Sequence, residues 1–331
     1  MTSDSVKMWT NMTEAEVQEM YVFAIELARK AGRAIVEGSS RRFASSAGYD
    51  QKKNTADLVT ETDEAVEALV KREIAGRYGT HAFIGEESWA AGEENAIGDQ
   101  VTWIVDPIDG TTNFVHGFAF TCISIGVVVD RKPTIGVVYA PFMDTLYHGC
   151  VGKGSFVSSA HYPTPQRLPL ASPQPLTSLN QALVAFEWGS DRRSEILARK
   201  LSSFAKITGD AQAGVVGGKF AQGVRSIGSA ALNFCNVASG SLDLYWEIGC
   251  WAWDVCAGIV IAQEAGAAVV GSHAHTMSVI ETDAFNQVTP DVLTGRKYVV
   301  VRAIATDQQS NIQAQKHILT EFYSCIDEWD P

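Results

Sequence analysis

Two helices are predicted at the start of the chain from the spacing of apolar residues. Thr13-Glu-Ala-Glu16 has the form of a capping box, and apolar residues recur at helical intervals over residues 17–35. The run Gly38-Ser-Ser-Arg-Arg predicts the end of this helix, and the polar, aperiodic residues 42–54 predict a loop. A second helix with one apolar face is predicted over residues 63–79.

Strand patterns follow these helices. Short apolar runs at residues 83–84 and 101–105 predict buried strands, and Pro107 predicts the end of the second strand because proline cannot donate to a ladder. Over residues 120–157, β-branched runs alternate with turns that contain glycine or proline, which predicts an antiparallel meander.

The second half of the chain has a different pattern. Residues 163–175 contain five prolines and are the best candidate for a linker. Beyond them, a predicted strand at residues 182–186 alternates with predicted helices at residues 230–239 and 255–265, which indicates an α/β arrangement. The predicted division is an N-terminal α+β domain over residues 1–175 and a C-terminal α/β domain over residues 176–331.

Composition narrows the class of protein. The 331 residues are 46% apolar, which is enough for one large domain or two abutting domains. No apolar run approaches the roughly 18–20 residues that span a bilayer, and the first residues lack the pattern of a secretory signal, so a cytoplasmic protein is expected. The net charge of −12 argues against a nucleic-acid partner. Divalent cations would nevertheless let an acidic cleft accept an anionic substrate.

Several catalytic signatures are absent from the sequence. Gly218-Lys219 is followed by Phe220, which does not fit a phosphate-binding P-loop, and no G-x-S-x-G elbow occurs. The six cysteines form no C-x-x-C pair and none has an arginine six positions later, so reduced, mostly buried thiols are expected. We interpret His273-Ala-His275 as a solvated loop and not as a metal site.

The strongest candidate chemistry lies at the end of a predicted strand. Asp106 closes the apolar run Trp103-Ile-Val105, and Asp109 follows three residues later. Two buried carboxylates at one strand end would repel each other, and a hard cation such as Mg²⁺ resolves that conflict. The amides of Gly110 and Thr111 come next, and they would point at an anion if a helix or tight turn begins there. Metals and amide donors side by side predict a phosphoryl site.

Each signal also has a plainer interpretation. Asp106 and Asp109 lie in D-P-x-D-G, which is common turn chemistry. Asp254 precedes a predicted apolar helix and could be only its N-cap. Glu86 could lie in a solvated turn after a strand, and Asp63 could merely cap the second helix.

Five segments, in order, resemble the inositol monophosphatase family of Mg²⁺-dependent, lithium-sensitive phosphatases. They are Asp57-Leu-Val-Thr-Glu-Thr-Asp63, Gly85-Glu-Glu-Ser88, Trp103-Ile-Val-Asp-Pro-Ile-Asp-Gly-Thr-Thr-Asn113, Gly223-Val-Arg-Ser-Ile-Gly-Ser-Ala230 and Trp253-Asp-Val-Cys-Ala-Gly258. The resemblance extends from about residue 22 to about residue 304. It implies an α/β fold with α-β-α-β-α layers and a homodimer.

The resemblance also implies two or three Mg²⁺ ions. Glu86, Asp106 and the carbonyl of Ile108 would hold the first ion. Asp106, Asp109 and Asp254 would hold the second, so that Asp106 bridges the two. A weaker third ion would involve Glu86.

The remaining roles implied by the resemblance concern the phosphate and the substrate. The amides of Gly110 and Thr111 would bind phosphate, and the Thr111 hydroxyl, oriented by Asp63, would help to activate the attacking water. The residues implied near the substrate are Lys52, Ser190, Ala230, Glu247 and Asp254.

A phosphatase of inositol 1-phosphate is the predicted function, because Glu247 and Ser190 offer an acceptor and a donor for ring hydroxyls. The alternatives are a quinate-pathway-associated ester, histidinol phosphate, fructose 1,6-bisphosphate and a phosphoadenosine nucleotide. The glycine-rich residues 209–223 are longer than in the shorter animal enzymes and resemble fungal members, including one associated with quinate-utilisation clusters. A non-catalytic paralogue is the rival from another class, but Glu86, Asp106, Asp109 and Asp254 are all acidic, which disfavours it.

Overall fold

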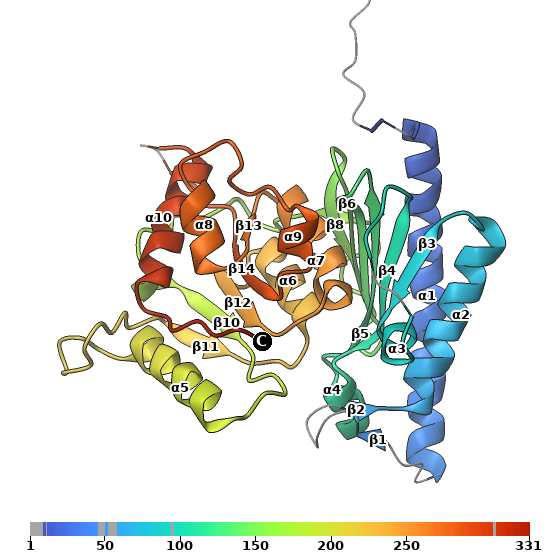
Figure 1. Ribbon diagram of the computed structural model, residues 1–331, viewed down its shortest axis with the longest axis horizontal. Helices are drawn as coiled ribbons and strands as arrows, with labels where there is room; N and C mark the ends of the chain where they lie inside the picture. The colour runs from blue at the N-terminus through green and yellow to red at the C-terminus, as the bar shows by residue number, and fades with distance from the viewer. Residues whose placement is uncertain (1–8, 11, 46–49, 52–57, 94–95, 307–308) are drawn as a thin grey trace, which may run out of the picture.

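Two large β-sheets and three layers of helices stack in the order α-β-α-β-α (Figure 1). The computed structural model describes residues 9–10, 12–45, 50–51, 58–93, 96–306 and 309–331. The predicted layered α/β fold is confirmed. All six cysteines are free thiols and five of them are buried, as predicted. No helix in the described part of the chain is both long enough and apolar enough to cross a membrane.

The first outer layer contains α1 (Glu14–Ser45) and α2 (Glu61–Arg77). The predicted capping box of α1 is present, since the Thr13 amide donates to the Glu16 carboxylate at 2.8 Å and the Glu16 amide donates to the Thr13 hydroxyl at 3.2 Å. The predicted end of this helix at Gly38 was wrong. A Cβ at residue 38 would overlap the side chain of Thr62. Gly38 therefore serves the close approach of α1 to α2, and this packing outweighs the roughly 1 kcal/mol that glycine costs within a helix.

Helix α2 begins two residues earlier than predicted, because Thr60 is its N-cap. The Thr60 hydroxyl accepts from the Thr62 amide at 3.2 Å. Asp63 completes a capping box by accepting from the Thr60 amide at 3.0 Å. The capping role that the sequence allowed for Asp63 is therefore real, and it fixes the side chain in the first turn.

The first sheet is packed against α1 and α2 on one face (Figure 1). Its strands, in spatial order, are β3 (Ala82–Gly85), β4 (Thr102–Asp109), β5 (Cys122–Val129), β6 (Lys132–Ala140), β7 (Thr145–Cys150), β8 (Gly154–Ser158) and β9 (Gln166–Arg167). All pairs except β3–β4 are antiparallel, so the predicted meander is confirmed. A separate two-stranded sheet pairs β1 (Asp50–Gln51) with β2 (Leu58–Val59).

Strand β4 does not end at Pro107, contrary to the prediction. Its pairing with β5 continues to Asp109, with a shift of register between Asp106 and Asp109. A bulge leaves the extra residues out of the ladder, so the missing N–H of proline is tolerated there. The same bulge lies between Asp106 and Asp109, two residues of the candidate site.

The central layer contains α6 (Ala230–Ser239), as predicted, and α7 (Ala252–Glu264), which begins three residues before the predicted start. Helix α7 contacts strands β4 to β8 of the first sheet. Gly126 and Gly136 are register partners on β5 and β6, and a Cβ on either residue would overlap the backbone or side chain of α7 near Ala257. This pair of glycines lets the helix lie directly on the sheet.

The second sheet has the strand order β11-β10-β12-β14-β13. Its strands are β10 (Leu183–Phe186), β11 (Gly223–Arg225), β12 (Leu244–Ile248), β13 (Ala268–Val270) and β14 (Lys297–Val301). Figure 1 shows α5 (Ser194–Thr208), α8 (His273–Val279) and α10 (Asn311–Tyr323) on its outer side. The short elements η1 (Leu179–Gln181) and α9 (Pro290–Leu293) complete this half.

The interpretation of His273-Ala-His275 as a loop was wrong, because these residues begin α8. Ser272 caps this helix through its hydroxyl, which accepts from the His275 amide at 3.2 Å.

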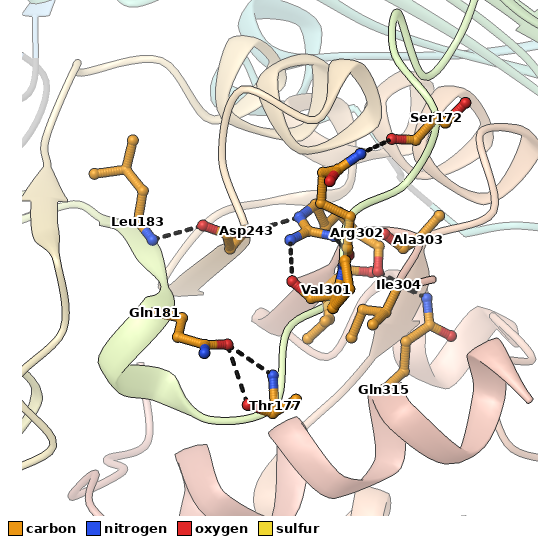
Figure 2. A network of polar contacts seen from close by, with 12 residues as sticks. Ser172, Thr177, Gln181, Leu183, Asp243, Val301, Arg302, Ala303, Ile304 and Gln315 are labelled. Atoms are coloured by element: carbon orange, nitrogen blue, oxygen red, sulfur yellow. Dashed lines mark hydrogen bonds and ion pairs between the residues drawn. The ribbon is translucent and has the colours of Figure 1, made fainter. Parts of the chain in front are cut away.

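The proline-rich residues 163–175 connect the two sheets and are anchored at both ends. Strand β9 pairs with β8 of the first sheet. At the other end, Arg302 donates to the carbonyl of Gln174 at 2.7 Å. Arg302 also donates to the Asp243 carboxylate at 2.6 Å (Figure 2). The domain boundary at residue 175 stays a prediction.

Candidate active site

Three aspartates meet where β4 ends and α7 begins. Asp106, Asp109 and Asp254 each offer a carboxylate oxygen, and these three atoms lie within 4.8 Å of one another. Among the described residues, this is the group of acidic, histidine and cysteine side chains with the geometry to hold a metal ion. Residues more than 140 positions apart in the chain are thus brought to one point.

Local structure fixes the orientation of each carboxylate. The Ile108 amide donates to Asp106 at 2.9 Å across the bulge. The Trp251 amide donates to Asp254 at 2.6 Å at the start of α7, so Asp254 lies in the first turn of this helix. The interpretation of Asp254 as an N-cap is therefore replaced, since Trp251 occupies that position.

Asp109 is held by donors from the central layer. The Ser229 hydroxyl donates to it, and the Ala231 amide donates to the same oxygen at 2.9 Å. The Ala230 amide lies 3.3 Å from its second oxygen, and the Cys122 thiol lies 3.6 Å away. These contacts come from the start of α6 and from β5.

Burial of three neighbouring carboxyls raises their pKa values. The pKa of Asp106 lies well above its ordinary value because of burial and the charges of Glu86, Asp109 and Asp254. Burial raises the pKa of Asp109 to about 6, although the donors around it favour the charged form. Burial and the charge of Glu86 raise the pKa of Asp254 to about 7. The cluster therefore retains protons that a cation would displace.

These residues fit a hard divalent cation. The donor set that the structure brings together consists of carboxylate oxygens. Magnesium and similar ions prefer oxygen ligands, and their charge compensates carboxylates that repel one another in a buried site.

Glu86 adjoins the cluster from the first sheet. It is the first residue of α3 (Glu86–Ala90), directly after β3, and its side chain is half-buried. Its charge contributes to the raised pKa values of Asp106 and Asp254. The buried carboxylate of Glu67 on α2 accepts from the amides of Glu87 and Ser88 at 2.7 Å each, which fixes the start of α3.

Gly110 and Thr111 form the start of α4 (Thr111–His116). A helix therefore begins at this point, as the sequence argument for anion-binding amides required. Gly110 is the N-cap in the left-handed conformation, with φ 90°, and a Cβ there would lie 2.8 Å from the Phe120 carbonyl. The Thr111 hydroxyl lies 3.2 Å from Asp63 and 3.1 Å from the Ile108 carbonyl. The pairing of Thr111 with Asp63 expected from the resemblance is thus present in the structure.

The residues predicted near the substrate come from several elements of the second half. Glu247 on β12 is buried, and it accepts from the Tyr245 hydroxyl and the Ile248 amide at 3.0 Å each. Burial and the charge of Glu187 raise its pKa well above the ordinary value. Ser190 is half-buried and lies in a loop that is held by Lys200, whose ammonium donates to the carbonyls of Trp188 and Asp191.

The predicted substrate contacts of Ala230 and Lys52 stay predictions. The Ala230 amide donates to Asp109. Lys52 lies outside the described residues.

Sequence reasoning missed the groups that hold the site together. Ser229 contacts Asp109, and its position directly before a predicted helix was a usable N-cap signal. Asn113 donates at 2.7 Å to the carbonyls of both Phe120 and Ile227, and Glu187 binds the loop that contains Ile227. No local pattern marks Glu187, because its partners are about 40 residues away.

Clustered carboxylates thus lie beside the start of a helix, between two sheets, with the geometry to hold a metal ion. The family model described as "Inositol monophosphatase family" matches residues 16–321. The chain belongs to the inositol monophosphatase family. It is accordingly a phosphoric monoester hydrolase of a metal-dependent family, as the resemblance implied.

Individual relatives cover most of the chain. "Protein qutG" of Emericella nidulans is 39% identical and covers 96% of each chain. "Inositol monophosphatase 2" of Saccharomyces cerevisiae is 39% identical over 79% of this chain and 85% of its own length. The solved inositol monophosphatase of Anabaena (Nostoc) is 24% identical with a TM-score of 0.66, covers 95% of this chain and 98% of its own, and shows the shared fold.

Proposed function

We propose that the chain hydrolyses a small polyol phosphate in a Mg²⁺-dependent reaction, with myo-inositol 1-phosphate as the substrate. The observation that supports this most is the cluster of Asp106, Asp109 and Asp254 next to the paired side chains of Thr111 and Asp63. The reaction cleaves the phosphorus–oxygen ester bond with water and yields the free alcohol and inorganic phosphate.

The proposed metal ligands are Glu86, Asp106 and the Ile108 carbonyl for one Mg²⁺, and Asp106, Asp109 and Asp254 for another. A third, weaker ion would use Glu86. Bound Mg²⁺ would supply charge stabilisation for the phosphoryl and leaving oxygens and would lower the pKa of water. This proposal needs each of the three aspartates, Asp106, Asp109 and Asp254, in its charged form.

The chain's own residues position the reacting groups. In the proposed reaction the Thr111 hydroxyl donates its single hydrogen bond to Asp63, 3.2 Å away, which leaves the lone pairs of that oxygen to accept from an attacking water. The amides of Gly110 and Thr111 at the start of α4 supply donors for phosphate oxygens. Because the ester needs no covalent enzyme intermediate, catalysis rests on positioning and charge stabilisation.

Glu247 supports a polyol as the leaving group. A carboxyl group has about four lone-pair sites, and the described residues occupy two of those of Glu247. The sites that remain can accept from ring hydroxyls. The other residues proposed on this side are Ser190, Ala230, Asp254 and Lys52.

A phosphate-release assay over a substrate panel tests the proposal. The panel contains myo-inositol 1-phosphate, histidinol phosphate, fructose 1,6-bisphosphate and a phosphoadenosine nucleotide, with Mg²⁺ titrated and Li⁺ added. We expect release with inositol phosphate that needs Mg²⁺, is inhibited by Li⁺ and stops in EDTA. Release that persists in EDTA contradicts the metal mechanism, and faster turnover of another ester replaces the proposed substrate.

Asp109→Asn separates the ligand role from a capping role. The amide keeps the volume but removes a charge, so we expect at least a hundredfold loss of activity. Asp99→Asn is the matched control, because the Asp99 side chain is exposed. Near-normal activity of the Asp109 variant would remove Asp109 from the metal site.

The predicted homodimer and cytoplasmic location also stay proposals. Light scattering of the purified chain tests the first, and fluorescence imaging of the tagged chain tests the second. A monomer over the concentration range of the assay would contradict the dimer.

A further inference from the structure

Glu187 accepts four hydrogen bonds from groups that border the candidate active site. It follows directly after β10. The Ser226 hydroxyl donates to one of its oxygens at 2.6 Å. The amides of Ile227 and Gly228 donate to the other at 2.8 and 3.0 Å, and the Asn233 side chain donates to it at 2.8 Å.

Glu187 and its neighbour Glu247 differ in the number of hydrogen bonds that they accept from the protein. Both oxygens of Glu187 accept from the protein: one is shared by three donors, which is more than its two lone pairs, and the other accepts from the Ser226 hydroxyl. Glu247, in contrast, accepts from two groups of the described chain. Glu187 is therefore bonded to the surrounding protein through both of its oxygens, which places it to hold the loop that supplies these donors.

The loop that Glu187 holds, residues 226–228, is also held from the opposite side. The side-chain amide of Asn113, in the first turn of α4, donates to the Ile227 carbonyl at 2.7 Å. The Gly228 carbonyl packs against Gly110, where a Cβ would lie 3.1 Å from it. The loop is thus clamped between the second sheet and the start of α4.

The next residues of the chain lead directly to the metal cluster. Ser229 donates to Asp109 through its hydroxyl, and the amides of Ala230 and Ala231 reach the same carboxylate at 3.3 and 2.9 Å. A shift of residues 226–228 therefore moves the donors that orient Asp109.

We propose that Glu187 is a positioning residue, which fixes the loop of residues 226–228 so that Ser229, Ala230 and Ala231 orient Asp109 for metal binding. The inference rests on the proposed function, because Asp109 is a proposed ligand. It predicts that the reach of the side chain at position 187 matters, whereas its charge does not. Groups that support metal ligands typically contribute about 10- to 100-fold to metal affinity.

Two variants separate reach from charge. Glu187→Gln can keep one oxygen toward Ile227, Gly228 and Asn233, and its amide can donate to the Ser226 hydroxyl oxygen. Glu187→Asp keeps the charge but is one methylene shorter, so it cannot bind all four donors. Isothermal titration of the purified full chain with Mg²⁺ alone should give a dissociation constant within about threefold of normal for Glu187→Gln, and about tenfold weaker for Glu187→Asp.

Glu264→Asp is the matched control. Glu264 also accepts from two backbone amides, those of Gly152 at 3.1 Å and Gly154 at 2.7 Å, in a hairpin of the first sheet. We expect this variant to lower the melting temperature without changing the Mg²⁺ dissociation constant.

Three results would overturn the proposal: a normal Mg²⁺ constant in Glu187→Asp, a larger loss in Glu187→Gln than in Glu187→Asp, or an equal loss in Glu264→Asp. Failure of the proposed function is a separate result. It is seen as absence of phosphate release from the unaltered chain, and it leaves the comparison of Mg²⁺ constants intact.

Discussion

His148 and Tyr21 form a polar pair inside the core of the first half. The Tyr21 hydroxyl lies 2.5 Å from Nδ1 of His148, and both residues are buried. Burial, together with the nearby charge of Arg29, lowers the pKa of His148 to about 4. The imidazole is therefore neutral in the folded protein at neutral pH, and protonation of it opposes folding.

This pair predicts part of the acid sensitivity of the protein. The pKa of histidine is 6.5 when unperturbed and about 4 in the folded state, so the unfolded state binds more protons between these values. Stability from His148 is present above pH 6.5 and is lost as the pH falls toward 4. We expect a contribution of about 2 kcal/mol to the loss of unfolding free energy between about pH 7.5 and about pH 5.

His148→Gln tests this expectation, because glutamine keeps a polar partner for Tyr21 and does not titrate. Urea unfolding at the two pH values should show a smaller pH effect in the variant. An unchanged pH effect would exclude His148 as a cause.

At the scale of elements, the packing of α7 on the first sheet decides where Asp254 lies. Gly126 and Gly136 face this helix from paired positions on β5 and β6. A side chain at either position would push α7 away from the sheet. Asp254 lies in the first turn of α7, so such a shift reaches the metal cluster.

Gly136→Ala tests this link between packing and the site. The added methyl would overlap the backbone of Ala257, so we expect a loss of stability of about 1–3 kcal/mol and weaker Mg²⁺ binding. Gly76→Ala on α2 is the control, because a Cβ there meets no neighbouring atom within 4 Å. That variant should be more stable by up to about 1 kcal/mol. Equal behaviour of the two variants would contradict the packing argument.

Arg302 and Asp243 join the proline-rich segment to the second sheet. Their side chains are only 10% and 16% exposed, and the Leu183 amide also donates to Asp243 (Figure 2). Arg302→Ala leaves a mostly buried carboxylate without its cation. We expect a loss of about 3 kcal/mol in unfolding free energy, measured by urea unfolding.

Asp243→Asn in the Arg302→Ala background is the informative control, since it removes the uncompensated charge. The double variant should recover part of the lost stability. A single variant within about 0.5 kcal/mol of normal would show that the pair is not structurally important.

At the scale of the whole molecule, metal binding and pH are coupled through the aspartate cluster. The folded pKa values of Asp109 and Asp254 are about 6 and about 7, against 3.8 for an ordinary aspartate. Between these values the folded state holds protons that the unfolded state has released. The contribution of the protonated aspartates to the free energy of unfolding is therefore fully present below pH 3.8 and is lost as the pH rises through about 6 to 7.

Mg²⁺ should therefore stabilise the protein more at high pH than at low pH. Bound cations replace the protons of the cluster and remove the repulsion of its charged form. We expect the rise in melting temperature with Mg²⁺ to be larger at about pH 8 than at about pH 5.5, with NaCl of matched ionic strength as the control. An equal rise at both pH values would contradict the displacement of the cluster's protons by the metal.

Local patterns predicted most elements because their signals lie within a few residues. Helix α6 was predicted with its observed bounds, since Ser229 caps its start and Gly240 ends it in the left-handed conformation. The errors at Gly38, Pro107 and His273 share one cause. In each case a contact, a bulge or a cap was stronger than the average tendency of the residue type.

By itself, the sequence determined the order of helices and strands, the layered fold through its resemblance to a family, and the aspartates worth considering. It could not show that Asp254 lies next to Asp106. Nor could it show that Glu187 binds the loop of residues 226–228 and that Ser229 donates to Asp109. Only the tertiary structure decided these points, because hydrogen bonds and charge interactions depend on distance in space. Separation along the chain carries no information about that distance until the sheets and helices have packed.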